Sequence, residues 1–282
     1  MRPILHMKKL KRIPIGLVVA AAIFLHQNAT AIPMVNLGTA SSFAVLAAST
    51  ITDAGGSTII TGDVGLYPGT AIGLTAGQVT GGTIYAAETG SDPLLIGATA
   101  DLTTAYNDAK GRSGGSTVGT ELGGTTLPPG IYDSASGTFG ITGTLTLNGG
   151  GVYIFQMATT LITAASSSVV LENGAEACHV FWQVGSSATL GTGTDFEGNI
   201  LAYTTITDNG GSTVEGRLLA MGGGQVGGAV NLGDTTITEA VCTGGNGGTG
   251  VPDTGSTLLL LGFGLATLLA FNRHPALAQR AY

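Results

Sequence analysis

Short apolar runs, separated by Gly, Ser, Thr and Asn, fill the chain from Val35 to Thr238. Many of these runs alternate between apolar and polar positions. In Thr50-Ile51-Thr52, for example, the alternation places Ile51 on one side of a strand and both threonines on the other. Runs of this kind, bounded by turn residues, are typical of short β-strands. The pattern therefore predicts a protein built mainly of strands and tight turns.

One stretch, residues 92–110, has the pattern of a helix instead. Asp92 or Ser91 is placed to cap its start, Pro93 suits the first turn, and Gly111 is placed to end it. The apolar residues fall near one face, so we expect the helix to pack lengthwise on the strands. These residues are Leu95, Leu102, Tyr106 and Ala109. The Gly-, Ser-, Thr- and Pro-rich segment 111–130 is expected to be a loop that caps the end of the strands.

Two repeats organise the strands. The nonapeptide at residues 50–58 recurs at residues 205–213 with eight of its nine positions identical. A shorter period links Phe196-Glu197-Gly198 to Val214-Glu215-Gly216, eighteen residues further on. A period near twenty with strand-and-turn texture is typical of a β-solenoid, in which each coil buries its apolar side against its neighbours. We therefore expect the two distant nonapeptides to form similar coils of one stack.

Composition agrees with a folded, acidic domain. Gly accounts for 48 of the 282 residues and charged residues for only 10%, yet 43% of the residues are hydrophobic. Disordered chains lack such apolar runs, so repeated tight turns explain the glycines better. Between Ile32 and Gly250, three basic residues stand against sixteen Asp or Glu, which gives a net charge of −13. This excludes a basic surface that could bind nucleic acid.

Both ends of the chain have the form of processing segments. Residues 1–31 read as a secretory signal peptide, with a basic start, the apolar run Ile13–Leu25 and small residues before the expected cleavage site. Residues 243–250 read as a flexible Gly-rich linker. Residues 251–282 contain the apolar run Leu258–Phe271, which is short for a membrane anchor. We therefore expect an exported protein whose folded domain spans residues 32–242.

Export permits a disulfide, and the chain has two cysteines, Cys178 and Cys242. The sequence leaves two readings open. The cysteines form a bridge, or Cys178 is simply a small buried hydrophobic residue.

Candidate catalytic and metal-binding groups are scarce. His179 is the only histidine between residues 32 and 250, so neither a His-based metal cluster nor a Ser-His-Asp triad is expected. Asp195 and Glu197 would share one face of a strand and could form an acid/base pair, although a solvated edge explains them more simply. The aspartates also lack the loop spacing of a calcium site. We expect neither an enzyme nor a metal or cofactor site.

A family resemblance rests on several motifs in a fixed order: Phe43-Ala44-Val45-Leu46, Thr61-Gly62-Asp63-Val64-Gly65, Gly81-Gly82-Thr83-Ile84, Leu127-Pro128-Pro129-Gly130-Ile131-Tyr132, Val152-Tyr153-Ile154-Phe155-Gln156 and the segment 178–191. In these motifs residues 35–241 resemble the microbial ice-binding (antifreeze) protein family. The resemblance implies an all-β fold with one long helix. The implied fold is a right-handed discontinuous β-solenoid of triangular cross-section, with the helix packed alongside and an N-terminal segment beside the C-terminal coils.

The tail carries a second resemblance. Val251-Pro252-Asp253-Thr254-Gly255 is similar to the Val-Pro-Asp-Ser-Gly variant of the PEP-CTERM class of bacterial C-terminal sorting signals, with Thr254 in the place of serine. The resemblance implies an exosortase as a partner, in addition to signal peptidase, and delivery to the cell surface or outer envelope. One departure is the basic end, where Asn272-Arg273-His274 replaces the usual arginine cluster.

The first resemblance implies that a monomer adsorbs to ice through a flat array of small hydroxyl- and methyl-bearing side chains. Threonine suits this task because its χ1 is stiff and strands lie about 4.7–4.9 Å apart. In some relatives a Thr-Ala/Gly-x-Thr/Asn motif marks the face, and Thr80-Gly81-Gly82-Thr83 matches it, as does 243–246 in the linker. The candidate ice-binding residues are Thr50, Thr52, Thr58, Thr189, Thr205, Thr207 and Thr213.

Two alternatives remain beside this interpretation. Threonine is a common surface residue of any strand, so a single threonine does not mark a binding face. A surface adhesin or matrix protein that binds extracellular polysaccharide would also be consistent with an exported solenoid that carries a sorting tail.

Overall fold

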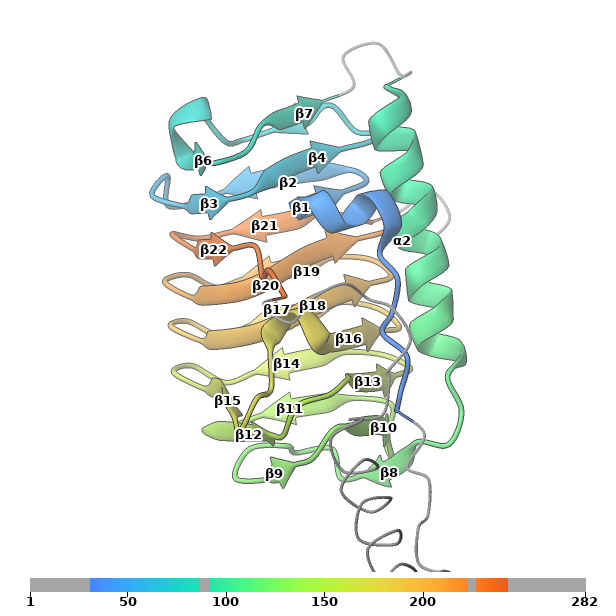
Figure 1. Cartoon of the computed structure of the whole chain (residues 1–282). Coiled ribbons are helices and arrows are strands. Elements are labelled where there is room, and N and C mark those ends of the chain that lie inside the picture. The colour runs from blue at the N-terminus through green and yellow to red at the C-terminus, as the bar shows by residue number, and fades with distance from the viewer. Residues whose placement is uncertain (1–30, 87–91, 223–226, 243–282) are drawn as a thin grey trace, which may run out of the picture. The chain divides into compact units, whose positions relative to one another are not determined.

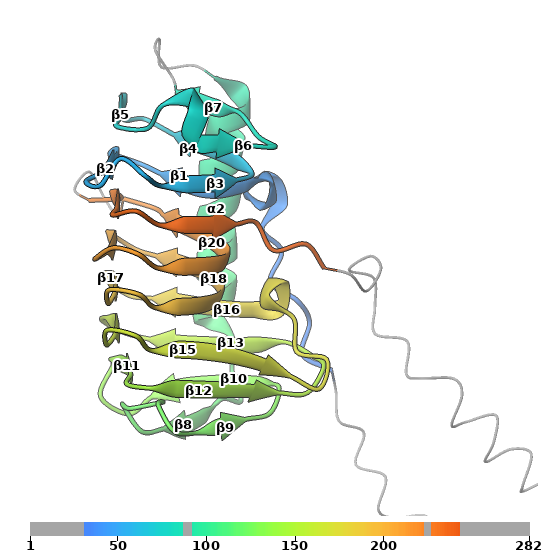
Figure 2. The same cartoon turned by 90° about the vertical axis from the view of Figure 1, so that its left-hand side faces the viewer.

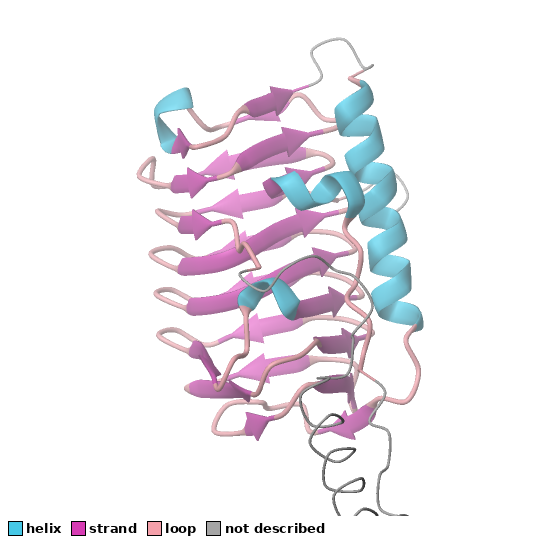
Figure 3. Cartoon of the chain, in the orientation of Figure 1, coloured by secondary structure: helices cyan, strands magenta, loops and turns pink. Residues whose placement is uncertain are grey.

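The computed structural model describes residues 31–86, 92–222 and 227–242. In this part of the chain, short parallel strands form a stack of coils, and one α-helix runs along the stack (Figures 1 and 3). The strands pair into a 15-stranded sheet and a seven-stranded sheet. The prediction of a mainly β protein with one long helix is confirmed.

Each full coil contributes strands to three faces, which we name A, B and C. Face A consists of β8 (Ser116–Val118), β10 (Gly130–Ser134), β13 (Tyr153–Met157), β16 (Val180–Val184), the second halves of β18 (Asp195–Ala202) and β20 (Thr213–Ala220), β1 (Phe43–Ala47), β4 (Asp63–Leu66) and β7 (Ile84–Ala86). Face B is the seven-stranded sheet of β11 (Phe139–Ile141), β14 (Leu161–Thr163), β17 (Ala188–Leu190), β19 (Ile206–Asp208), β21 (Val230–Leu232), β2 (Thr50–Asp53) and β5 (Ala71–Ile72).

Face C completes the coils. It consists of β9 (Thr126–Leu127), β12 (Thr144–Asn148), β15 (Ser168–Glu172), the first halves of β18 and β20, β22 (Thr236–Thr238), β3 (Ile59–Thr61) and β6 (Val79–Thr80). Three short 3-10 helices, η1 (Gly38–Ser42), η2 (Ala76–Gln78) and η3 (Ala177–His179), lie between strands of the described chain.

The order of coils in space differs from their order in the sequence. The N-terminal strands β1–β7 form one end of the stack, and α2 then runs along the stack to its other end. From there, β8–β22 add coils back toward β1–β7 (Figure 1). The two parts meet in parallel register on all three faces, where Val45 pairs with Leu218, Ile51 with Val230, and Ile60 with Ile237. The expected placement of the N-terminal segment beside the C-terminal coils is therefore confirmed.

The nonapeptide repeats confirm the same arrangement. Thr50–Asp53 forms β2 and Ile206–Asp208 forms β19, both in face B, and only β21 lies between them. Ile51 and Ile206 are fully buried and pair with the same residue, Val230. Segments about 150 residues apart in the sequence thus build nearly adjacent coils.

Helix α2 (Pro93–Gly111) lies where the apolar pattern predicts it and covers face A. Asp92 caps its first turn by accepting a hydrogen bond from the backbone of Leu94 at 2.8 Å. At its other end, the side-chain amide of Gln156 on β13 donates to the carbonyl oxygen of Ala109 at 2.6 Å. The buried residues of the helix include all four that the sequence pattern placed on one face: Leu95, Leu102, Tyr106 and Ala109.

The interior of the coils is apolar and contains a ladder of aromatic rings. Phe155 stacks on Trp182 with ring centroids 4.0 Å apart, and Tyr132 and Phe196 extend this ladder on either side at 5.2 and 5.3 Å. The indole nitrogen of Trp182 donates to the carbonyl oxygen of Glu197 at 3.0 Å, so the buried ring has no unmet polar group. The ladder links neighbouring coils through side chains of face A and, at Phe196, of face C.

The prediction of a loop at residues 111–130 is wrong in part. The segment contains β8 and β9, and Glu121 bridges to Gly140 of face B, so it forms the terminal coil itself. Helix α2 holds one end of this coil against the stack. The composition of the segment does not indicate this contact. The predicted signal peptide (1–31, of which only Ala31 is described), the linker and the sorting tail lie outside the described residues. Among the described residues, no helix is long and apolar enough to span a membrane.

Candidate functional site

Face B presents mostly small, uncharged side chains, with the exposed Glu121, which bridges to Gly140, at one end. The strands of face B run one above another along one side of the stack (Figure 2). In each strand the buried or partly buried residue Phe139, Leu161, Ala188, Ile206, Val230, Ile51 or Ile72 points inward, and the residues on either side of it point outward. Strand pairing aligns the outward residues into two columns. The first column is Ala71, Thr50, Ala229, Thr205, Ser187, Thr160 and Thr138. The second is Gly73, Thr52, Asn231, Thr207, Thr189, Ile162 and Gly140.

Five of the seven candidate threonines lie together in these columns: Thr50, Thr52, Thr189, Thr205 and Thr207. Hydrogen bonds fix part of the second column. The hydroxyl of Thr52 donates to the side-chain oxygen of Asn231 at 2.9 Å, and the side-chain nitrogen of Asn231 donates to the hydroxyl of Thr207 at 3.4 Å. The Thr52–Asn231 bond crosses the seam between the two parts of the chain, and the Asn231–Thr207 bond continues it to the next coil, so the face is ordered where it is assembled from distant segments.

Carboxylates border face B but are turned away from it. Asp208 is buried and accepts hydrogen bonds from the hydroxyls of Ser212, at 2.5 Å, and Thr235. Burial tends to raise the pKa of Asp53, but hydrogen bonds from Thr58 and Gln78 outweigh this effect and lower the pKa below its ordinary value. The border acids are therefore bound within the fold, and the outward columns of face B remain neutral.

Thr58 is not a surface residue, so the expectation that it contacts a ligand is wrong. It is fully buried, its hydroxyl donates to Asp53 at 2.8 Å, and the same oxygen accepts from the backbone of Thr235 at 3.2 Å. The reason is a turn of different length. Thr213, its counterpart in the nonapeptide, aligns through Thr236 with Ile59, because the turn after β2 is one residue longer than the turn after β19.

Thr213 is exposed, but it lies on face C and not with the five threonines of face B. The Thr80-Gly81-Gly82-Thr83 motif also lies outside face B. Thr80 belongs to β6 at the end of face C, where its hydroxyl is 3.2 Å from that of Thr61. The motif at residues 243–246 is outside the described residues.

Face C is interrupted by carboxylates. Glu197 and Glu215 are cross-strand neighbours, and Asp195 precedes Glu197 by two residues on the same side of β18. Burial, together with the charges of Glu215 and Asp195, raises the pKa of Glu197 to about 7. One carboxylate oxygen of Glu197 is buried without a hydrogen-bond partner in the described chain. Asp195 and Glu197, which the sequence offered as an acid/base pair, thus form a cluster of like charges with Glu215 on the strand surface.

Cys178 and Cys242 are joined in a disulfide, with an S–S distance of 2.07 Å and Cα atoms 5.6 Å apart. The open alternative is thus resolved in favour of a bridge. Glu176 and His179 complete a group of donor atoms that lie within 4.8 Å of one another. Because both sulfurs are oxidised, no thiolate is available there to bind a metal, and His179 and Glu176 pair with each other at 3.3 Å.

Several members of face B are not apparent from the sequence repeats. Asn231, Ser187, Thr160 and Thr138 join the two columns, although their strands do not repeat the nonapeptide. The available signal was the polar–apolar–polar alternation of Ser187-Ala188-Thr189 and the position of Asn231 beside Val230, which mark outward positions but not the face to which they belong.

Comparison with known proteins identifies the family of the chain. Residues 45–238 match the family described as Ice-binding-like, and residues 250–274 match the VPDSG-CTERM motif. The chain is 42% identical over 244 residues to an ice-binding protein of Nostoc sp. (strain HG1), covering 84% of this chain and 86% of that protein. It is 41% identical over 200 residues to an ice-binding protein of Colwellia sp., covering 66% of this chain and 78% of that protein.

Solved structures show the same similarity. The crystal structure of an ice-binding protein from the Antarctic ascomycete Antarctomyces psychrotrophicus superposes with a TM-score of 0.66 at 38% identity, covering 74% of this chain and all of that one. A second, an ice-binding protein from an Antarctic biological consortium, gives a TM-score of 0.68 at 38% identity, covering 76% of this chain and 95% of that one.

Proposed function

The chain belongs to the Ice-binding-like family, and from that premise we propose that it is an ice-binding protein that adsorbs to ice through face B. Adsorption would curve the advancing ice front and inhibit ice growth or recrystallisation. The observation that carries this assignment is the pair of uncharged, outward columns of Thr, Ser, Ala, Asn, Gly and one Ile on a parallel sheet. We propose further that the solenoid is right-handed with a triangular cross-section, monomeric and without enzymatic activity.

Face B is favoured over the other two faces by what covers or charges them. Helix α2 covers face A. Face C carries Asp195, Glu197 and Glu215 in its central strands, and carboxylates hold water strongly through charge-assisted hydrogen bonds. An ice surface offers no compensating positive charge, so burying these groups against it would be costly. Face B has no charged side chain in the outward columns defined above.

The geometry of face B suits an ordered water lattice. Neighbouring strands lie about 4.7–4.9 Å apart, and outward residues two positions apart along a strand are separated by roughly 6.6 Å. Threonine keeps its methyl and hydroxyl groups in fixed positions because χ1 is restricted. The hydrogen bonds among Thr52, Asn231 and Thr207 restrict these side chains further. A pre-ordered array loses little conformational entropy when it adsorbs.

We infer a route of export that is compatible with this role. The N-terminal segment 1–31 would be removed by signal peptidase, and the matched C-terminal motif would be processed by an exosortase-type enzyme, which would place the domain at the cell surface or outer envelope. The disulfide between Cys178 and Cys242 supports an oxidising destination outside the cytoplasm.

The experiment that tests the proposal is ice recrystallisation inhibition by residues 32–250, compared with the variants Thr207→Tyr and Thr238→Tyr. Thr207 lies near the centre of face B, and Thr238 is the matched exposed threonine of face C. We expect the wild type and Thr238→Tyr to inhibit recrystallisation and Thr207→Tyr to lose most of this activity. A folded but inactive wild type would contradict the proposal and favour the polysaccharide-binding alternative, which a glycan array would then test.

A further inference from the structure

We propose that the surface-attached chain fixes its cell to ice, because its point of attachment lies on the side of the stack away from face B. This inference rests on the proposed function and on the sorting motif at residues 250–274. It adds an adhesive role to the inhibition of ice growth. The partner is a solid ice surface, and the attached molecule acts as a tether between that surface and the envelope.

The chain leaves the folded domain from a fixed point. After β22, Glu239 forms an ion pair with Arg217 at 2.7 Å, and its backbone nitrogen donates to Thr61 at 3.0 Å. Ala240 is buried, Val241 is 77% exposed, and Cys242 is bonded to Cys178 in η3. The last described residue is therefore covalently held to the stack, and any pull on the tail acts at the disulfide.

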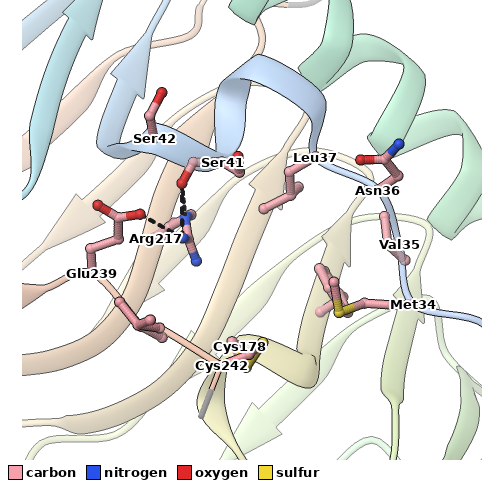
Figure 4. Close-up of a pocket in the computed structure, with 13 residues that line it drawn as sticks. Met34, Val35, Asn36, Leu37, Ser41, Ser42, Cys178, Arg217, Glu239 and Cys242 are labelled. Carbon is pink, nitrogen blue, oxygen red and sulfur yellow. Dashed lines mark hydrogen bonds and ion pairs between the residues drawn. A yellow bond between two sulfur atoms is a disulfide. The ribbon is translucent and has the colours of Figure 1, made fainter. Parts of the chain in front are cut away.

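Figure 4 shows the surroundings of this exit point. Arg217 begins the face-A half of β20, and its guanidinium also donates to the carbonyl oxygen of Ser41, at 2.8 and 3.0 Å. A pocket of about 440 Å³ separates this ion pair from the disulfide, with Met34 and Leu37 of the N-terminal segment on its other side. The exit point thus lies where faces C and A meet, and Arg217 links Glu239 there to Ser41 of the described N-terminal segment.

Face B lies on the other side of the stack from this corner. In Figure 2, β11, β17, β2 and β5 follow one side of the stack, and η3 and the end of β22 lie on the opposite side. The aromatic core of the coils stands between the two. A domain attached through Cys242 to a surface would therefore turn face B outward, whereas a tail leaving from face B itself would press that face against the envelope.

The charge of the domain favours this orientation. Only seven residues separate Cys242 from the sorting motif that begins at residue 250, so the exit corner is the part of the domain nearest in sequence to the point of attachment. Glu176 and Glu239 lie at the exit corner, paired with His179 and Arg217, and the domain as a whole is acidic, with sixteen Asp or Glu against three basic residues between residues 32 and 250. Anionic lipid therefore repels the domain and prevents it from lying flat on the membrane.

The test uses bacteria that process this class of tail and express the full chain. A suspension of these cells is passed over a growing ice surface, and the cells that remain on the ice are counted. Three strains are compared: the full chain, the full chain with Thr207→Tyr, and a chain that ends at Gly250. An antibody against the domain measures display on intact cells. The chain that ends at Gly250 lacks the sorting motif and is expected in the medium. Recrystallisation inhibition by that medium measures ice binding independently of attachment.

We expect the full-chain strain to be retained on ice and the other two strains to wash off like cells without the protein. The medium of the strain with the shortened chain should inhibit recrystallisation. If that medium is inactive, the proposed function fails and the adhesive role fails with it. If the medium is active but the full-chain cells wash off, or the antibody finds no domain on them, the adhesive role alone is overturned.

Discussion

The carboxyl group of Glu197 makes folding sensitive to pH in an unusual direction. Burial, the charge of Glu215 and the charge of Asp195 raise its pKa from 4.5 to about 7. A carboxyl group with a raised pKa binds its proton more tightly in the folded state. Its contribution to stability is therefore full below pH 4.5 and is lost as the pH rises through 7. Replacing Glu197 by Gln removes this penalty while keeping the size of the side chain.

The magnitude follows from the size of the pKa change. A rise from 4.5 to about 7 would correspond to about 3 kcal/mol for a fully shielded group. Because Glu197 is only partly buried, solvent screening reduces this to roughly 1–2 kcal/mol. For a domain of this size we expect Glu197→Gln to melt roughly 3–6 °C above the wild type at pH 8. At pH 4 the two proteins should melt together.

Thermal unfolding followed by circular dichroism at pH 4 and pH 8 measures this difference. Glu239→Gln is the matched control, because Glu239 is ion-paired with the largely buried guanidinium of Arg217. Its replacement leaves that charge without a full partner and should lower the melting temperature at pH 8. If Glu197→Gln is no more stable than the wild type at pH 8, or keeps its advantage at pH 4, the assigned cause is wrong.

Three further substitutions test the structural framework. Thr58→Val removes a buried hydroxyl with two hydrogen bonds and should lower the free energy of unfolding by about 1–3 kcal/mol; urea denaturation measures this, and recrystallisation inhibition by the folded protein should not change. Replacing Cys178 and Cys242 by Ala removes a crosslink between residues 64 positions apart and should cost about 4 kcal/mol, visible as a lower urea midpoint; an unchanged midpoint would contradict the bridge. Gly216→Ala places a Cβ atom 1.9 Å from the carbonyl oxygen of Gly198 at a φ of +151°, so we expect a strain of about 1–3 kcal/mol or more and a lower melting temperature, whereas a neutral result would rule out this close approach.

The sequence identified the main elements because their signals are local. The cap, proline and apolar stripe of α2 all lie within one segment, and the helix ends within a residue of its predicted bounds. The nonapeptide repeat also predicted correctly that distant segments share one stack, since identical side chains in identical turns build similar coils.

What the sequence could not supply is the assignment of each outward residue to a face. Alternation places both Thr207 and Thr213 on the outside, but only the turn between them decides that one lies on face B and the other on face C. The turn after β2 is one residue longer than the turn after β19 and includes Thr58, which is therefore buried, although the sequence around it is nearly identical. Such placement depends on the register between coils, which is set by contacts far apart in the chain.

The same limit applies to the bridge and to the terminal coil. Cys178 and Cys242 are brought together by η3 and the end of β22, and nothing in their spacing requires it. The segment 111–130 reads as a loop because its strands are very short. It becomes a coil only because β10 and β12 offer it paired edges, through Tyr132 with Ser116 and Thr146 with Thr126.

The most direct test of ice binding through face B is adsorption to a single ice crystal. Fluorescently labelled wild type, Thr207→Tyr and Thr238→Tyr would each be frozen slowly into a growing single-crystal hemisphere, and the bound fluorescence measured. We expect the wild type and Thr238→Tyr to label the ice equally and Thr207→Tyr to be excluded from it. Equal labelling by all three would show that face B is not the contact surface, and exclusion of the folded wild type would contradict ice binding altogether.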